Sequence, residues 1–320
     1  MTSASWASPE LVSTSALNVQ RWFNVVLLAV SCCTGVAQSE PRLVTKGGTD
    51  YSIGAVPEWV LRTTIREGPP GTAGSAAPIR NLLLDYQVSL LGTTPQLYTH
   101  QARAVQTFGA VEKAANIPIT FSPDSQRLTV HALAVLRGGR HIDKLPTARV
   151  ELLRSEAGQE STPYDGVVTA TFVLDDVRAG DIVDVEYTLS SEPSVSGELY
   201  NSTLPLAASE PVDTLRVRVL NRVRRPLRYS VLFADVTPRV TRHGDVSELT
   251  LERTSVPAIH VEASTPEDAI PWPRLRLSEY MTWAQGRGVG RRAVPGARAS
   301  ERNPCGRPIE PVSVSGGRRA

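Results

Sequence analysis

Residues 167–189 read VVTATFVL, then DDVRAGD, then IVDVEYTL. The two outer parts are apolar and rich in β-branched residues, a composition that is typical of strands. The middle part is charged and holds one glycine, Gly180, as turns often do. The stretch therefore predicts strands at 167–174 and 182–189, joined by a turn. In this turn we expect a positive φ angle at Gly180 and backbone N–H groups bound by Asp176 and Asp181.

Similar strand signals recur along the chain at the spacing of a β-sandwich. They cover residues 82–91, 97–108, 117–121, 128–136 and 148–153 before this stretch, and residues 214–220, 227–236, 246–252 and 259–262 after it. Arg137-Gly138-Gly139-Arg140 is typical of a hairpin turn, because paired glycines supply positive φ angles. No helical period separates the strands. The sequence therefore predicts an all-β fold, an antiparallel β-sandwich that is either one large sandwich or two small ones.

Changes in composition divide the chain into five parts. They are a leader and signal peptide (1–37), an N-terminal segment with a Gly/Pro-rich linker (38–80), a β-sandwich (81–190), a second β unit or the rest of the same sandwich (191–283), and a basic low-complexity tail (284–320).

The start of the chain predicts export. Arg21 precedes a short apolar run at residues 22–30, and the small residues Gly35 and Ala37 suit cleavage after Ala37. The run is too short to span a bilayer. We expect a periplasmic, outer-membrane-associated or secreted protein that meets the membrane only through its signal peptide or through lipidation of Cys32.

The sequence assigns no catalytic, cofactor-binding or metal-ligating residue. The cysteines are Cys32, Cys33 and Cys305, so residues 38–303 hold no thiol for a disulfide, a metal site or a nucleophile. Cys305 lacks the surroundings that lower a thiol pKa, and no histidine follows His260 to act as its base. We therefore expect the chain as given to be no enzyme and to use no cofactor.

A cluster of four aspartates can be interpreted either as a calcium site or as residues that hydrogen-bond within the turn. It comprises Asp175, Asp176, Asp181 and Asp184. Calcium needs several oxygens that converge on one point, and no spaced loop motif provides them here. Hydrogen bonding within the turn is the preferred interpretation.

The histidines are spread singly and show no ligand spacing. They are His100, His131, His141, His243 and His260. His131 alternates with Val130 and Ala132, which predicts a hydrogen-bonded structural residue on the face opposite Leu128 and Val130.

A run of arginines suggests a basic stripe. Arg216 and Arg218 share one strand face, and others follow at Arg222, Arg224, Arg225 and Arg228. Such a stripe can bind nucleic acid or anionic lipid, but no aromatic residues for stacking accompany it. We expect a solvated face whose arginines pair with Asp and Glu, and no nucleic-acid partner.

Short motifs follow one another in a characteristic order between residues 51 and 283. They are Pro57-Glu58-Trp59-Val60, Leu84-Asp85-Tyr86-Gln87-Val88, Ile119-Thr120-Phe121-Ser122-Pro123, Leu128-Thr129-Val130-His131, Arg137-Gly138-Gly139, Tyr164-Asp165-Gly166, the turn at 176–181, and Ser278-Glu279-Tyr280 before Trp283. In this order and spacing the chain resembles the bacterial domain-of-unknown-function family 3857. Ser122 departs from the family, in which an acidic residue often precedes the proline.

The resemblance implies the N-terminal β domain that precedes a transglutaminase-like catalytic core, with the core itself not present here. It implies substrate presentation or protein–protein interaction, with a protein or peptide as the partner. Two alternatives stay open. One is a fragment of a transglutaminase-like or papain-like cysteine enzyme that acts on protein or peptide amides and has lost its core. The other is a free-standing adhesive or carbohydrate-binding β-sandwich.

The tail also has two interpretations. Residues 286–320 are rich in Arg, Gly and Pro, which predicts a disordered basic segment. Members of the family that the chain resembles continue instead with an apolar helix holding a second tryptophan. Codons chosen for residues 286–291 and shifted by one base give Val-Val-Ala-Trp-Ala-Val, so a frameshift after Gln285 is the other hypothesis.

Overall fold

Strands dominate the computed structural model, which describes residues 41–65, 77–154, 166–192, 199–259 and 271–280. A single 3₁₀ turn, η1 (Phe108–Ala110), and one short helix, α1 (Val111–Ala115), interrupt the strands of these residues. None of the helical segments described is long and apolar enough to cross a membrane. The expected signal peptide, the tail at 284–320, the three cysteines and His260 lie outside the described residues.

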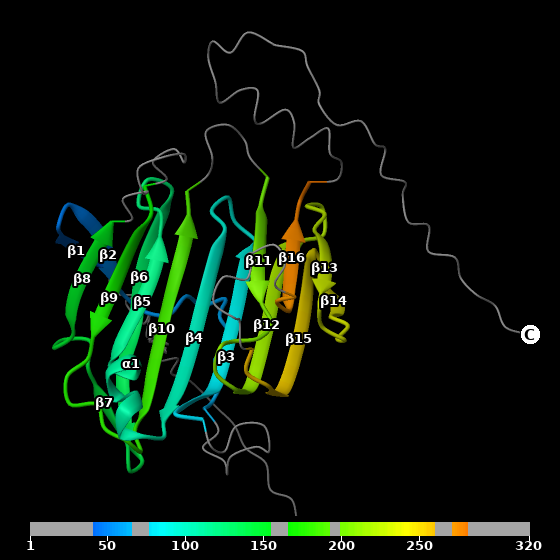
Figure 1. Cartoon of the computed structure of the whole chain (residues 1–320). Coiled ribbons are helices and arrows are strands. Elements are labelled where there is room, and N and C mark those ends of the chain that lie inside the picture. Colours follow the sequence, from blue (N-terminus) through cyan, green and yellow to red (C-terminus); the bar gives the residue numbers. More distant parts are fainter. Residues whose placement is uncertain (1–40, 66–76, 155–165, 193–198, 260–270, 281–320) are drawn as a thin grey trace, which may run out of the picture. The chain divides into compact units, whose positions relative to one another are not determined.

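Ten strands form one large sheet (Figure 1). In spatial order they are β1 (Arg42–Lys46), β2 (Thr49–Ile53), β6 (Gln126–Arg137), β10 (Ile182–Ser191), β4 (Gln96–Val105), β3 (Ile79–Leu90), β12 (Val212–Arg222), β15 (Val246–Val256) and β14 (Arg239–His243), with β7 (Arg140–Asp143) beside β6. Two small antiparallel sheets accompany it. They are β5 (Asn116–Phe121), β9 (Val168–Val173) and β8 (Arg149–Arg154), and β11 (Asn201–Pro205), β16 (Arg274–Ser278) and β13 (Arg228–Leu232).

The large sheet is mixed, so the prediction of a purely antiparallel fold was wrong. β3 and β12 run parallel, as do β2 and β6. Parallel neighbours need a crossover connection, and the chain between β3 and β12 supplies one by passing through β11 of a small sheet. The sequence did not decide whether the strands before and after residue 190 form one sandwich or two. Because β12 pairs with β3, strands from both parts belong to the same large sheet.

Most predicted strands are present within a few residues of their expected ends. The prediction at 259–262 lies mostly outside the described residues, and Ile259 is not in a strand. The short strands β1, β2, β7, β11, β14 and β16 were not predicted, although the turn before β7 was. β1 and β14 are largely exposed, so they lack the alternation of buried and exposed residues that marks a strand in sequence. The hairpin at Gly138 and Gly139 is confirmed, with φ angles of 55° and 74°.

Both small sheets cover the same face of the large sheet. Val185, Gln101, Leu84 and Leu215 are cross-strand neighbours on β10, β4, β3 and β12, so their side chains share one face. Two apolar cores lie on this face. The first joins β6 and β10 to the sheet of β5, β8 and β9, through residues such as Leu133, Val185, Ile119 and Phe172. The second joins β3, β12 and β15 to the sheet of β11, β13 and β16, through residues such as Leu84, Val217, Leu249 and Leu275.

The turn before β10 is built largely as predicted. Gly180 has a φ of 93°, and the Asp181 carboxylate accepts the backbone N–H of Arg178 at 2.7 Å. The guanidinium of Arg137 also donates to both oxygens of Asp181, at 2.8 and 2.7 Å. The expectation for Asp176 was wrong, because its carboxylate accepts from the side chains of Arg137 and Arg178 in place of a backbone N–H. Asp175 pairs with Lys144.

We expect Asp181→Asn to destabilise the fold more than Gly180→Ala. A Cβ at Gly180 meets no atom within 4 Å, so the alanine costs only its positive φ angle, about 1 kcal/mol. The asparagine offers Arg137 one acceptor in place of two and carries no charge. Urea unfolding followed by circular dichroism measures both variants. Glu151→Gln, which removes an exposed carboxylate beside Arg149, is the control that should change little. An Asp181→Asn midpoint equal to that of the wild type would contradict this role of Arg137.

The ion pairs of Asp176 should make stability depend on pH. Hydrogen bonds from Arg178 and Arg137 lower the pKa of Asp176 to about 2, against about 3.9 in an unfolded chain. The unfolded chain binds the proton more tightly, so the contribution of Asp176 is complete above about pH 5 and disappears as the pH falls toward 2. The difference in unfolding midpoint between wild type and Asp176→Asn should follow this course in a pH series. A difference that stays constant down to pH 2 would show that the pairs do not form.

Candidate functional site

The second face of the large sheet carries a row of charged residues, three of which are buried. Glu186, His100, Asp85, Arg216 and Glu252 are successive cross-strand neighbours on β10, β4, β3, β12 and β15. Glu186, His100 and Asp85 are buried, whereas Glu252 lies at the exposed end of the row. Cross-strand neighbours of opposite charge attract, so the row aligns these strands as well as filling the face.

His100 lies between Glu186 and Asp85 in this row and has a third carboxylate, that of Asp184, beside it. Its Nε2 lies 2.7 Å from Oδ1 of Asp184, which is also buried. Burial disfavours the protonated ring, but the hydrogen bond and the charge of Asp184, helped by Glu186 and Asp85, outweigh burial and raise the pKa of His100. The hydroxyl of Tyr98 donates to Glu186 at 2.8 Å.

A segment without regular secondary structure, residues 54–65, lies over this face and bonds to it. Arg62 donates to both oxygens of Glu186 at 3.0 Å, and the hydroxyl of Thr63 donates to Asp85 at 2.9 Å. The backbone of Leu61 exchanges two hydrogen bonds with the side-chain amide of Gln87. These contacts supply further hydrogen-bond partners for polar groups that are buried in this face.

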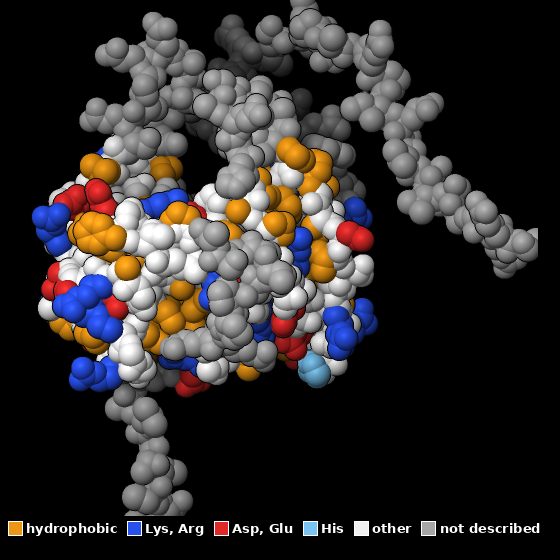
Figure 2. Space-filling model, turned by 60° about the horizontal axis from the view of Figure 1, so that its bottom comes forward, with side chains coloured by type: hydrophobic (Ala, Val, Ile, Leu, Met, Phe, Trp, Pro, Cys, Tyr) orange, Lys and Arg blue, Asp and Glu red, His pale blue; other side chains and the backbone are white. Residues whose placement is uncertain are grey.

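The arginine stripe on β12 belongs to the same face. Arg216 lies 3.8 Å from Asp85 and 3.7 Å from Glu252, and Arg218 donates to Glu248 at 2.5 Å and to the carbonyl of Trp59 at 2.8 Å. The expected acidic partners are therefore present. The expected solvation is wrong for these two, because their side chains are only 24% and 16% exposed. Figure 2 shows Lys and Arg mixed with Asp and Glu on the surface that it displays.

The other described histidines take separate places. His131 lies on the face opposite the buried Leu128 and Val130, as predicted. Its Nδ1 is 2.9 Å from the carbonyl of Gly54 and its Nε2 is 2.7 Å from the hydroxyl of Thr188. Burial lowers the pKa of His131. His141 and His243 are exposed.

The predicted acidic cluster is divided in the structure. Asp175, Asp176 and Asp181 each bind a basic side chain at the turn. Asp181 also accepts the backbone N–H of Arg178, which is the turn chemistry preferred from the sequence. Asp184 lies on β10 and bonds to His100. The cluster around His100 was not predicted, because its members come from strands that are far apart in sequence.

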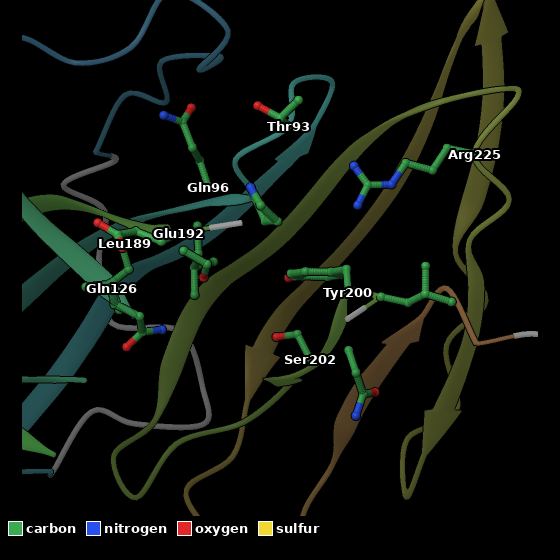
Figure 3. A pocket seen from close by; sticks show the side chains of 13 residues that line it. Thr93, Gln96, Gln126, Leu189, Glu192, Tyr200, Ser202 and Arg225 are labelled. Carbon is green, nitrogen blue, oxygen red and sulfur yellow. The ribbon is translucent and has the colours of Figure 1, made fainter. Parts of the chain in front are cut away.

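A pocket of about 400 Å³ lies where β4 begins and β10 ends, beside β11. Leu97 and Leu189 contribute apolar surface from the large sheet. Figure 3 shows Tyr200 and Ser202 on one side of the pocket, opposite Gln126, Leu189 and Glu192. The pocket therefore combines apolar patches with several hydrogen-bonding side chains, as binding sites commonly do.

Glu279 holds the β11 side of the pocket in place. Its carboxylate forms an ion pair with Arg225 and accepts the backbone N–H of Tyr200 at 2.8 Å. Arg225 also donates to the carbonyl of Gly92 at 3.3 Å. Because Glu279 is buried and pairs with Arg225, it neutralises the charge of this arginine in the pocket wall.

The strand β11 is an edge strand among the described residues. It pairs with β16 on one side only, and the hydrogen bonds to β16 use Tyr200 and Leu206. Backbone groups alternate along an antiparallel strand, so the N–H and C=O groups of Asn201 and Thr203 point away from β16. Both of these residues are exposed. The edge ends at Pro205, which has no N–H to offer.

Comparison with known proteins supports the family resemblance. Residues 94–260 match the family model of DUF3857, a domain of unknown function with solved structure. The chain has no significant match among curated proteins.

One solved structure shares the fold at low sequence identity. A crystal structure of a putative protease from Parabacteroides distasonis is similar with a TM-score of 0.57 and 17% identity, over 64% of this chain and 41% of that chain. An M1 zinc metallopeptidase from Deinococcus radiodurans aligns with a TM-score of only 0.32 and 13% identity, over 63% of this chain and 43% of that one. This chain thus spans less than half the length of these proteins. The family match covers more than half of the chain, which therefore belongs to the DUF3857 family.

Proposed function

We propose that this chain is an exported, non-catalytic β module that binds an extended protein or peptide segment and presents it to a catalytic core. The observation that carries the proposal is the edge of β11, which no strand of the described part of the chain pairs, beside a partly apolar pocket. Export is inferred from the signal-like segment that ends at Ala37.

Strand addition explains how such a surface would bind a polypeptide. An extended segment that lies along β11 can hydrogen-bond to the N–H and C=O groups of Asn201 and Thr203. Backbone hydrogen bonds give affinity without regard to sequence. The side chains of the segment alternate in direction, so every second one can enter the pocket and meet Leu97, Leu189 or Tyr200.

The proposed context is a larger hydrolase. The similar crystal structure from Parabacteroides distasonis is named a putative protease, and its fold matches this chain over 41% of its length. A β module that guides an extended substrate suits an enzyme that acts on polypeptides. The resemblance noted from the sequence specifies this context further, as a transglutaminase-like core following the β module.

Thr203→Pro tests the proposed binding edge. Proline removes the N–H that faces away from β16 and leaves the ladder to β16 intact. We expect the wild-type chain to select short peptides from a random phage-displayed library. Thr203→Pro should bind a selected peptide about tenfold more weakly in fluorescence polarisation, the equivalent of roughly one lost hydrogen bond plus a steric clash.

Thr203→Val is the matched control, because it changes the same exposed side chain and keeps the N–H. It should bind as the wild type does, and the melting temperatures of all three proteins should agree. Selection of no peptide by the wild type would refute polypeptide binding. Equal affinity of Thr203→Pro and wild type would remove β11 from the binding site.

A further inference from the structure

Three potential metal ligands meet beneath residues 54–65, on the face of the sheet opposite the two apolar cores. A ring nitrogen of His100 and one carboxylate oxygen each of Asp184 and Glu186 lie within 4.8 Å of one another. All three residues are buried. Imidazole nitrogen together with carboxylate oxygen is a ligand set that suits zinc and related divalent transition metals.

Asp85 provides an independent sign that a ligand is missing. The residue is 1% exposed, and its Oδ1 is buried without a hydrogen-bond partner. Its Oδ2 accepts hydrogen bonds from Thr63 and Gln87, and the guanidinium of Arg216 on β12 lies 3.8 Å from the same oxygen. Asp85 has Arg216 of β12 as its cross-strand neighbour on one side and His100 of β4 on the other. Since Oδ2 is engaged near Arg216, Oδ1 is the oxygen that remains available toward His100.

The charges of this cluster do not balance. Three carboxylates, those of Asp85, Asp184 and Glu186, are accompanied by two guanidinium groups, those of Arg62 and Arg216. Arg218 in the next row pairs with Glu248. One further positive charge is needed, since an uncompensated buried charge is costly. A proton on His100 can supply it, and so can a divalent ion that displaces Arg62 from Glu186.

We propose that His100, Asp184 and Glu186, with Asp85 as the fourth ligand, bind one divalent transition-metal ion, with zinc as the first candidate. Zinc–ligand distances of about 2.0–2.2 Å place tetrahedral ligand atoms about 3.3–3.6 Å apart. The ligand atoms of His100, Asp184 and Glu186 lie within 4.8 Å of one another, so rotation of these side chains can bring them to one ion, and Asp85 joins them when its Oδ1 turns toward His100. The ion replaces the hydrogen bond between His100 and Asp184. This site is separate from the β11 edge and does not depend on the function proposed there.

Neighbouring residues already orient the carboxylates, as partners of metal ligands do. Tyr98 donates to Glu186, and Thr63 and Gln87 donate to Asp85. Arg62 donates to both oxygens of Glu186, and its side chain is 65% exposed. Arg62 is therefore free to move outward when the ion takes its place on Glu186.

An entry route lies next to the cluster. A pocket of about 380 Å³ opens beside residues 62–64. Its wall includes Arg62, Thr63 and Arg216, each of which contacts a proposed ligand residue. An ion can therefore reach Asp85 and Glu186 from this pocket when side chains of this wall move aside.

The test measures zinc retained by the full chain without a polyhistidine tag. The parent protein carries Cys32→Ser, Cys33→Ser and Cys305→Ser, because thiolates outside the site would bind zinc themselves. The protein is mixed with excess zinc, passed through a desalting column and measured by mass spectrometry of the metal. We expect one zinc ion per chain in the parent and less than a tenth of that in Asp184→Asn.

His141→Gln, which removes an exposed histidine on β7, is the matched control and should retain the same zinc as the parent. Nitrogen NMR of the parent covers the case in which Asp184→Asn does not fold. Zinc should then shift the ring nitrogen of His100 and leave that of His131 unchanged. Zinc retained fully by a folded Asp184→Asn, no zinc in the parent, or a His100 ring that stays protonated in excess zinc would each overturn the proposal.

Discussion

The large sheet depends on one constraint, namely that its central strands are buried on both faces although one of these faces carries charged residues. On β10, the valines 183 and 185 face the apolar cores, and Asp184 and Glu186 face the other side. A buried charge is tolerated only when it has partners. The cross-strand row from Glu186 through His100 and Asp85 to Arg216 provides these partners. The row also fixes the register of the strands, because a strand that slipped by one residue would place its charges in the apolar core.

The same constraint explains why residues 54–65 lie where they do. The charged row needs hydrogen-bond partners above the plane of the sheet, and Arg62, Thr63 and the backbone of Leu61 supply them. The segment also reaches the pocket on the other side of the sheet. The indole N–H of Trp59 donates to Gln96 at 2.6 Å, and Gln96 lines the pocket beside β11. The segment over the charged face and the pocket beside β11 therefore both contact Gln96, the first residue of β4.

The apolar half of this architecture could be predicted from the sequence, whereas the polar half could not. Alternating Val, Leu and Ile residues predicted most core strands, and Gly138-Gly139 and Gly180 marked two turns correctly. The parallel pairing of β3 with β12 depends on a crossover that no local pattern encodes. The cluster at His100 joins residues from three strands, and only polar pairs spaced two residues apart, such as Asp184 and Glu186, hinted at it. The edge of β11 was hidden because the strand is short and mostly polar.

Amide hydrogen exchange of the intact chain tests the central claim most directly, because it reports whether residues 54–65 cover the charged face. Val60 N–H bonds to the carbonyl of Pro57 and Leu61 N–H bonds to Gln87. The account predicts that peptides covering these residues exchange slowly in the wild type and much faster in Glu186→Gln, which weakens the attachment of Arg62. Peptides from β5 and β9, which lie on the other face, should exchange equally in both proteins. Exchange of residues 54–65 at the rate of an unstructured chain in the wild type would contradict the account.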